Sequence, residues 1–154
     1  MTDEADKADS LRMVRLHRRL DCQPYRAYRA WSSPDALTTW FPDEVQGSLS
    51  PGARSTLVFP GRQVWWDVLE AEPESHFQFR WPWTPADGLV TTVTVTISPR
   101  GYGSLVSIED GPFDLSVPGV LDAYAESLAG WGEALANLRA VMDFSVDLRR
   151  YRSG

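Results

Sequence analysis

The sequence has almost none of the residues that build disulfides and cysteine-ligated metal sites, because Cys22 is its only cysteine. A single thiol excludes an internal disulfide and any zinc site made of cysteines. It fits a reducing compartment, so we expect a cytoplasmic protein. No apolar run approaches the roughly 18 residues that a membrane-spanning helix needs. Residues 1–10 also lack the apolar segment of a signal peptide, and we expect no membrane partner.

Positive charge is also scarce, since the chain of 154 residues has a net charge of −6. Nucleic acids are bound largely through phosphate contacts made by lysine and arginine, and an acidic chain offers no broad basic surface for them. We therefore expect no nucleic-acid partner. The length fits one domain with a substantial core.

Catalytic and metal-binding motifs are missing as well. The sequence has no glycine-rich phosphate loop, no nucleophile elbow and no H-E-x-x-H pair. Its two histidines, His17 and His76, fall where side chains are expected to point outward from strands. Glu109 and Asp110 are neighbours in a strand, so they point to opposite faces and are not expected to share a site. We predict no metal and no cofactor, and no catalytic residue can be named.

The strongest positive signal is a long helix over residues 118–142. Its apolar residues recur at steps of three and four, which is the period of an α-helix and not of a strand. They are Leu121, Tyr124, Leu128, Trp131, Leu135, Leu138 and Met142. Ser116 or Asp114 is expected to cap the helix, with Pro118 in its first turn. Asn137 falls between the apolar positions and is assigned to the solvated side.

Two glycines, Gly130 and Gly132, flank Trp131 inside this helix. Each costs about 1 kcal/mol relative to alanine in a helix, so their presence needs a reason. One interpretation is close packing, in which a bare backbone lets a strand approach. The other is that the missing side chains leave room for a ligand beside the indole.

Around the helix, the chain shows turn-bounded runs that are typical of strands. The clearest spans residues 76–81, where Phe77, Phe79 and Trp81 alternate with polar residues. About seven strands are expected, over residues 11–20, 45–49, 54–59, 63–71, 76–81, 89–98 and 105–110. Short helices over residues 24–31 and 34–40 follow the first strand. Ser33 is expected to cap the second, with Pro34 at its first position.

The segregation of strands and helices predicts an α+β fold, with a curved antiparallel sheet wrapped around the long C-terminal helix. We expect residues 11–146 to form a single domain. Residues 1–10 are expected to be a disordered lead-in, and residues 147–154 a basic C-terminal tail.

Four groups of residues, in this order, resemble the motifs of a known family. They are residues 18–24, an aromatic run within residues 28–41, the turn and strand of residues 70–81, and the G-W-x-x-x-L-x-x-L pattern of residues 130–138. The aromatic run consists of Tyr28, Trp31, Pro34, Leu37, Trp40 and Phe41. On these residues the sequence is similar to the activator of heat-shock-chaperone ATPase homologue-like proteins, within the START/Bet v 1-like (SRPBCC) superfamily.

The resemblance implies a helix-grip (Bet v 1-like) fold with a cavity between the sheet and the long helix. Three residues depart from the family pattern. Cys22 stands where alanine is usual, Trp66 stands where glycine is usual, and Trp83 is an additional aromatic residue. The added bulk is expected to shrink or reshape the cavity.

The resemblance also places aromatic side chains around this cavity. Aromatic walls with few polar groups are typical of sites for apolar or flat small molecules. We therefore predict binding of a small hydrophobic or aromatic ligand. The expected ligand-binding residues are Arg18, Trp40, Phe41, Trp66, Phe79, Trp81, Tyr124, Leu128 and Trp131.

Two other functions stay open at this point. A polyketide cyclase or dehydratase-like enzyme would require a polar group in the cavity, for example Arg18 or Asp67. Both have simpler interpretations, because Arg18 can snorkel to water at a sheet edge and Asp67 is expected on the solvent face. The third possibility is a chaperone-regulating interaction protein, which the family name suggests. We expect a monomer or a homodimer.

Overall fold

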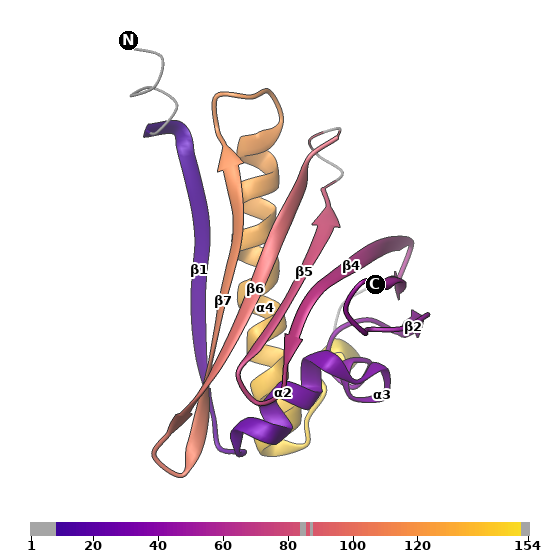
Figure 1. The fold of residues 1–154 in the computed structure, drawn as a ribbon, viewed down its shortest axis with the longest axis vertical. Helices are drawn as coiled ribbons and strands as arrows, with labels where there is room; N and C mark the ends of the chain where they lie inside the picture. The colour runs from indigo at the N-terminus through magenta and orange to yellow at the C-terminus, as the bar shows by residue number, and fades with distance from the viewer. Residues whose placement is uncertain (1–8, 84–85, 87, 152–154) are drawn as a thin grey trace.

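The computed structural model describes residues 9–83, 86 and 88–151 (Figure 1). One antiparallel sheet of seven strands carries a long helix on one face, and two short helices lie at one end of the sheet. In chain order the elements are β1 (Leu11–Leu20), α2 (Pro24–Ser32), α3 (Pro34–Leu37), β2 (Glu44–Gln46), β3 (Arg54–Phe59), β4 (Arg62–Glu72), β5 (His76–Pro82), β6 (Val90–Arg100), β7 (Gly103–Asp114), α4 (Val120–Phe144) and the 3₁₀ turn η1 (Leu148–Tyr151). The predicted helix-grip fold is confirmed.

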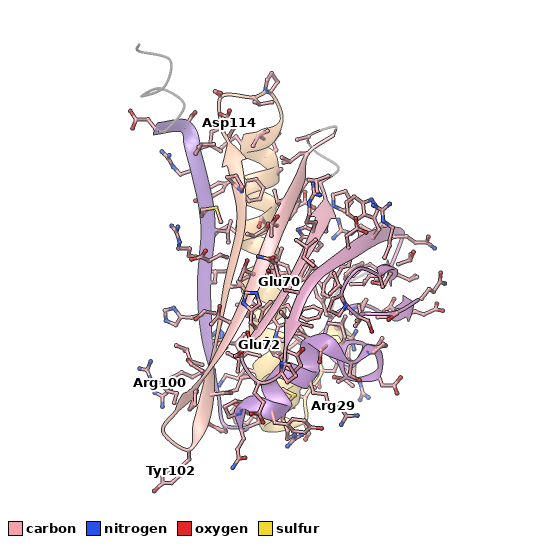
Figure 2. The ribbon with its side chains drawn as sticks, in the orientation of Figure 1. Arg29, Glu70, Glu72, Arg100, Tyr102 and Asp114 are labelled. Carbon is pink, nitrogen blue, oxygen red and sulfur yellow. The ribbon has the colours of Figure 1, made fainter. Side chains whose placement is uncertain are left out.

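The sheet has the order β1-β7-β6-β5-β4-β3-β2, so the first strand pairs with the last. Its inner face is built by side chains that alternate along each strand. In β5, Phe77, Phe79 and Trp81 are buried, as the sequence pattern predicts. The outer face carries polar side chains, among them Glu70 and Glu72, which Figure 2 shows on the side of the sheet away from α4. The ring of His76 lies 2.8 Å from the Glu70 carboxylate.

Two strands differ from the prediction by three or more residues at one end. β2 ends at Gln46 instead of residue 49, and β7 runs from Gly103 to Asp114 instead of stopping at Asp110. The extension of β7 is paired with β1, where Leu11 faces Asp114. Backbone hydrogen bonds to β1 thus extend β7 beyond the residues in which apolar and polar side chains alternate.

The start of α4 corrects the predicted capping. The helix begins at Val120, so Pro118 lies outside it, and its N-cap is Gly119 with a φ of 85°. Neither Ser116 nor Asp114 caps the helix: the Asp114 carboxylate accepts hydrogen bonds from Ser10 and Ser116 instead. The left-handed conformation at Gly119 favours glycine, which turns the chain sharply from β7 into α4.

The buried face of α4 also differs from the predicted stripe. Leu121 and Leu128 are 58% and 42% exposed, whereas Ser127 and Asn137 are buried. The reason is the width of the aromatic side chains beneath the helix. Small and polar helix residues fit above large rings that already fill the space. Trp131, Leu135 and Leu138 are buried, as predicted.

Aromatic rings fill most of the interior between sheet and helix. Trp31, Trp40, Trp66 and Trp131 are each exposed by 1% or less. The ring of Trp66 stacks on Phe79 with centroids 3.6 Å apart and planes 14° apart. Trp66 therefore occupies space that the usual glycine would leave free, which agrees with the expected reduction of the cavity.

The end of the chain folds back onto the domain. Arg149 donates hydrogen bonds to the carbonyl oxygens of Thr38, Phe41 and Pro42, and it also pairs with Asp147 at 2.8 Å. Residues 147–151, predicted as part of a basic tail, thus hold the chain segment that follows α3. Residues 1–8 of the expected lead-in and residues 152–154 lie outside the described part of the chain.

Replacing Arg149 with methionine is expected to lower the free energy of unfolding by about 1–3 kcal/mol, because several hydrogen bonds from a charged group are lost. The hydrogen bonds from Arg149 lower the pKa of Asp147 to about 2, against an ordinary value of 3.8. The contribution of this carboxylate is therefore complete above pH 3.8 and is lost as the pH falls through about 2. Urea denaturation checks the loss. The exposed Arg150→Met is the control, and equal losses in both variants would contradict the prediction.

Within the described residues, no helix is both long and apolar enough to cross a membrane.

Candidate ligand-binding cleft

The aromatic interior opens to the surface between α4 and the turn that joins β3 to β4. The cleft there has a volume of about 250 Å³. Its aromatic walls are Trp40, Phe41, Phe59, Trp81, Trp83 and Trp131. The helix contributes Ser127, Gly130, Ala134 and Asn137, and the mouth carries Arg62, Glu126 and Glu133.

The walls are rings packed against rings. Phe41 stacks on Trp131 with centroids 5.3 Å apart and planes 24° apart, and Trp81 lies 5.0 Å from Trp131. The indole N–H of Trp40 donates to the carbonyl of Ala30 at 2.9 Å. Offset and edge contacts of this kind are favourable for aromatic pairs and fix the orientation of each ring. The cleft therefore has preformed aromatic walls.

The structure brings four of the nine predicted site residues together in the cleft: Trp40, Phe41, Trp81 and Trp131. Trp66 and Phe79 lie behind them as buried core. Tyr124 packs against Phe113 with centroids 5.7 Å apart, outside the cleft. Leu128 faces outward on α4, which is incompatible with a place on the inner wall.

The polar residues considered for the cavity lie elsewhere. Arg18 is on β1 and does not line the cleft. Asp67 is on the solvent side, as expected, where Arg54 donates to both of its oxygens at 2.6 and 2.8 Å. Neither residue supplies a polar group to the aromatic cleft.

Gly130 lies on the wall of the cleft, next to Trp131. A Cβ atom added at Gly130 or Gly132 would meet no atom within 4 Å, apart from its chain neighbours and the backbone of its own helix. Close packing against a neighbouring strand is thus the wrong explanation of these glycines. At Gly130 the missing side chain leaves open space in the cleft, as the second interpretation proposed.

A buried carboxylate that the sequence did not reveal lies beneath the cleft. Asp110, on β7, is 0% exposed. Its Oδ2 accepts hydrogen bonds from Ser127 Oγ at 2.7 Å and from Trp131 Nε1 at 3.1 Å. Its Oδ1 accepts one from Thr91 Oγ1 at 2.6 Å, and Thr91 in turn accepts the indole N–H of Trp83 at 2.7 Å.

The electrostatics of Asp110 combine two opposing effects. Burial raises the pKa of this carboxyl above its ordinary value, while the hydrogen bonds from Thr91, Ser127 and Trp131 lower it. Burial is the larger effect. The N–H of Trp81 also favours the charged form, although its geometry falls short of a hydrogen bond. The expectation that Glu109 and Asp110 do not share a site agrees with the structure, since Glu109 pairs with Arg15 at the surface.

The mouth of the cleft carries charges of both signs. Arg62 lies 3.5 Å from Glu126, and Glu133 is exposed. Asn137 is committed to other groups: its amide donates to the carbonyl of Trp40 at 2.8 Å, and its oxygen accepts the backbone N–H of Leu148. Among residues 9–83, 86 and 88–151, no group of three or more His, Cys, Asp or Glu side chains is placed to hold a metal ion.

Comparison with known families agrees with this architecture. The model of the family described as "Activator of Hsp90 ATPase homolog 1-like protein" matches residues 21–143. The chain belongs to this family. Among proteins with curated descriptions, no relative of this member of the Hsp90 ATPase activator homolog 1-like family is found.

Solved structures of similar fold include several bacterial proteins. Protein MLL2253 from Mesorhizobium loti has a TM-score of 0.76 and 24% identity, with 88% of this chain and 99% of that chain covered. The Aha1 dimer from Colwellia psychrerythraea has a TM-score of 0.75 and 15% identity, covering 86% and 97%. CalU16 from Micromonospora echinospora has a TM-score of 0.70 and 21% identity, covering 88% and 78%. At these identities the likeness establishes the shared fold alone.

Proposed function

We propose that the cleft binds a small, flat, largely apolar molecule. The observation that supports this is the opening at Gly130, where preformed indole and phenyl surfaces line unfilled space beside Trp131. Concave, mostly apolar sites with a few polar groups are typical of small-molecule binding.

The size of the cleft limits the ligand. Sites for drug-sized molecules measure roughly 300–1,000 Å³, and the cleft at about 250 Å³ is smaller. It suits a molecule of one or two fused rings and not a sterol. Burying about 200 Å² of apolar surface at about 25 cal/mol per Å² contributes about 5 kcal/mol before the costs of association. Since about 5 kcal/mol corresponds to a Kd of about 0.2 mM and association costs reduce it further, affinity from shape alone is expected to be about millimolar.

The alternatives rank lower on the same observations. The cyclase-like hypothesis requires a polar group in the cavity, and the two examples named from the sequence, Arg18 and Asp67, lie outside the cleft. The carboxylate nearest to the cleft, Asp110, is fully buried, and both of its oxygens are hydrogen-bonded within the protein. A chaperone-regulating role would act through the outer surface and does not account for the open aromatic cleft. We place the protein in the cytoplasm as a monomer or homodimer; the dimeric Aha1 from Colwellia psychrerythraea makes the homodimer worth testing.

Replacing Gly130 with leucine is expected to fill the cleft and weaken ligand binding at least tenfold, without unfolding the protein. The matched control is Ala129→Leu, because Ala129 is the exposed neighbour on α4 and does not line the cleft. The measurement is a titration of intrinsic tryptophan emission with coumarin, a flat two-ring molecule. Wild type and Ala129→Leu should show a saturable change.

Two results would contradict the proposed function. One is equal binding by Gly130→Leu and the wild type, which would place the ligand elsewhere. The other is the absence of any saturable change across coumarin and a panel of one- and two-ring aromatics, flavonoids and fatty acids. A chaperone-regulating interaction protein would then be the leading hypothesis.

A further inference from the structure

One polar group at the floor of the cleft differs from the others in its hydrogen bonding, and this difference bears on the chemistry of the ligand. Most buried polar groups on its walls are already paired. The indole N–H groups of Trp40, Trp83 and Trp131 donate to Ala30, Thr91 and Asp110. The side chain of Asn137 is bonded through both its nitrogen and its oxygen.

Ser127 is different because only one side of its hydroxyl is used. It donates its single hydrogen to Asp110 Oδ2 at 2.7 Å. Ser127 is one of the residues that line the cleft, and its oxygen retains lone pairs that can accept. Ser127 therefore presents a hydrogen-bond acceptor, and not a donor, to whatever occupies the cleft.

The network around Asp110 fixes this polarity. An indole N–H can only donate, so the bond from Trp131 makes Oδ2 an acceptor. Trp83 likewise donates to Thr91, whose own hydrogen goes to Oδ1. When Asp110 is ionised, both carboxylate oxygens accept, and the hydroxyl hydrogen of Ser127 points at Asp110 and away from the cleft.

The indole N–H of Trp81, which also lines the cleft, does not compete for this role. It favours the charged form of Asp110, although its geometry falls short of a hydrogen bond, so it is directed toward that carboxylate. The cleft therefore offers one acceptor, Ser127, within aromatic walls.

We propose that the cleft selects planar aromatic molecules that carry a neutral hydroxyl group, which donates its hydrogen to Ser127 Oγ. This inference rests on the proposed function and names the substrate class of the same cleft. A phenol fits both features, because its ring lies against Trp131 and Phe41 while its hydroxyl donates to Ser127. An aromatic carboxylate fits poorly: it has no hydrogen to donate, Asp110 lies directly behind Ser127, and Glu126 and Glu133 stand at the mouth.

Three matched probes test the proposal: 2-naphthol, its methyl ether 2-methoxynaphthalene, and 2-naphthoate. Each is titrated into ¹⁵N-labelled full-length protein, with the tryptophan indole signals followed by NMR. One hydrogen bond of ordinary net strength corresponds to a preference of up to about tenfold. We expect 2-naphthol to bind about tenfold more tightly than the methyl ether, and 2-naphthoate to bind most weakly.

Ser127→Ala should remove the preference for 2-naphthol while the methyl ether still binds. The control is Ser55→Ala, a buried serine on β3 that lies outside the cleft and should keep the preference. If Ser127→Ala does not fold, the comparison of the three probes on the wild type still decides the question.

The possible failures are distinguishable. Equal binding of 2-naphthol and the methyl ether to the wild type would overturn the choice of a hydroxyl ligand and leave the proposed function standing. Tightest binding of 2-naphthoate would also overturn it, since Arg62 would then be the anchor. If none of the probes binds, the proposed function fails together with the inference.

Discussion

Replacing Trp131 with alanine is expected to lower the free energy of unfolding by about 3–5 kcal/mol, the usual range for a buried aromatic truncated to alanine. Trp131 is 1% exposed and contacts Trp31, Phe41 and Trp81. Its removal leaves a cavity in the middle of the ring cluster and takes one hydrogen bond from Asp110. Urea denaturation, analysed as a two-state transition, gives the loss.

The control for Trp131 lies one turn away on the same helix. Leu128 is 42% exposed, so Leu128→Ala should cost less than about 1 kcal/mol. A loss below about 1 kcal/mol for Trp131→Ala would mean that the indole does not support the core. Equal losses for the two variants would contradict the observed orientation of α4, in which Trp131 faces the core and Leu128 faces the solvent.

The second large effect concerns the carboxylate beneath the cleft. Replacing Asp110 with alanine leaves Thr91, Ser127 and Trp131 without their common acceptor. A buried donor without a partner costs about 1–3 kcal/mol, and the hydroxyls can turn toward other acceptors while the indole cannot. We therefore expect a loss of about 2–4 kcal/mol in the free energy of unfolding, measured by urea denaturation.

The same residue predicts a pH dependence of known sign. Burial raises the pKa of Asp110 in the folded protein above its ordinary value of 3.8. Its contribution to stability is thus complete below the unfolded pKa and is lost as the pH rises through the folded pKa. Relative to Asp110→Asn, the wild type should therefore lose stability as the pH rises above about 4. Urea denaturation of both variants across a series of pH values measures the difference.

Glu109→Gln is the control for this pH dependence. Glu109 is the neighbour of Asp110 in β7, but it is half exposed and paired only with Arg15 at the surface. Exposed ion pairs contribute little to stability. If the wild type instead gained stability over Asp110→Asn with increasing pH, Asp110 would be stabilised as the charged form, and the predicted sign would be wrong.

Much of the fold could be predicted because its signals are local. The alternation of Phe77, Phe79 and Trp81 identifies β5, and Ser33 before Pro34 marks the start of α3, where Ser33 Oγ accepts the N–H of Ala36. The period of the apolar residues predicts α4. Each of these signals depends on residues a few positions apart, within reach of a single helix turn or strand.

The floor of the cleft could not be predicted, because its partners are distant in the sequence. Asp110 is buried only because Thr91, Ser127 and Trp131 converge on it from β6 and α4. A hydropathy pattern assigns a carboxylate or a serine to the surface unless such partners are known. For the same reason the sequence analysis placed Leu128 inside and Asn137 outside. The aromatic rings that displace Leu128 lie on other elements, and so does the Trp40 carbonyl that binds Asn137.

The packing of the rings also has an optical consequence. Trp31, Trp40, Trp81 and Trp131 form a chain of contacts in which neighbouring rings, linked in part through Phe41, have centroids 4.8 to 5.7 Å apart. At such separations, excitation absorbed by one indole passes to the others before it is emitted. The four indoles therefore share their excitation energy. A molecule that quenches the fluorescence of Trp81 or Trp131 in the cleft also lowers the emission of the indoles buried behind them.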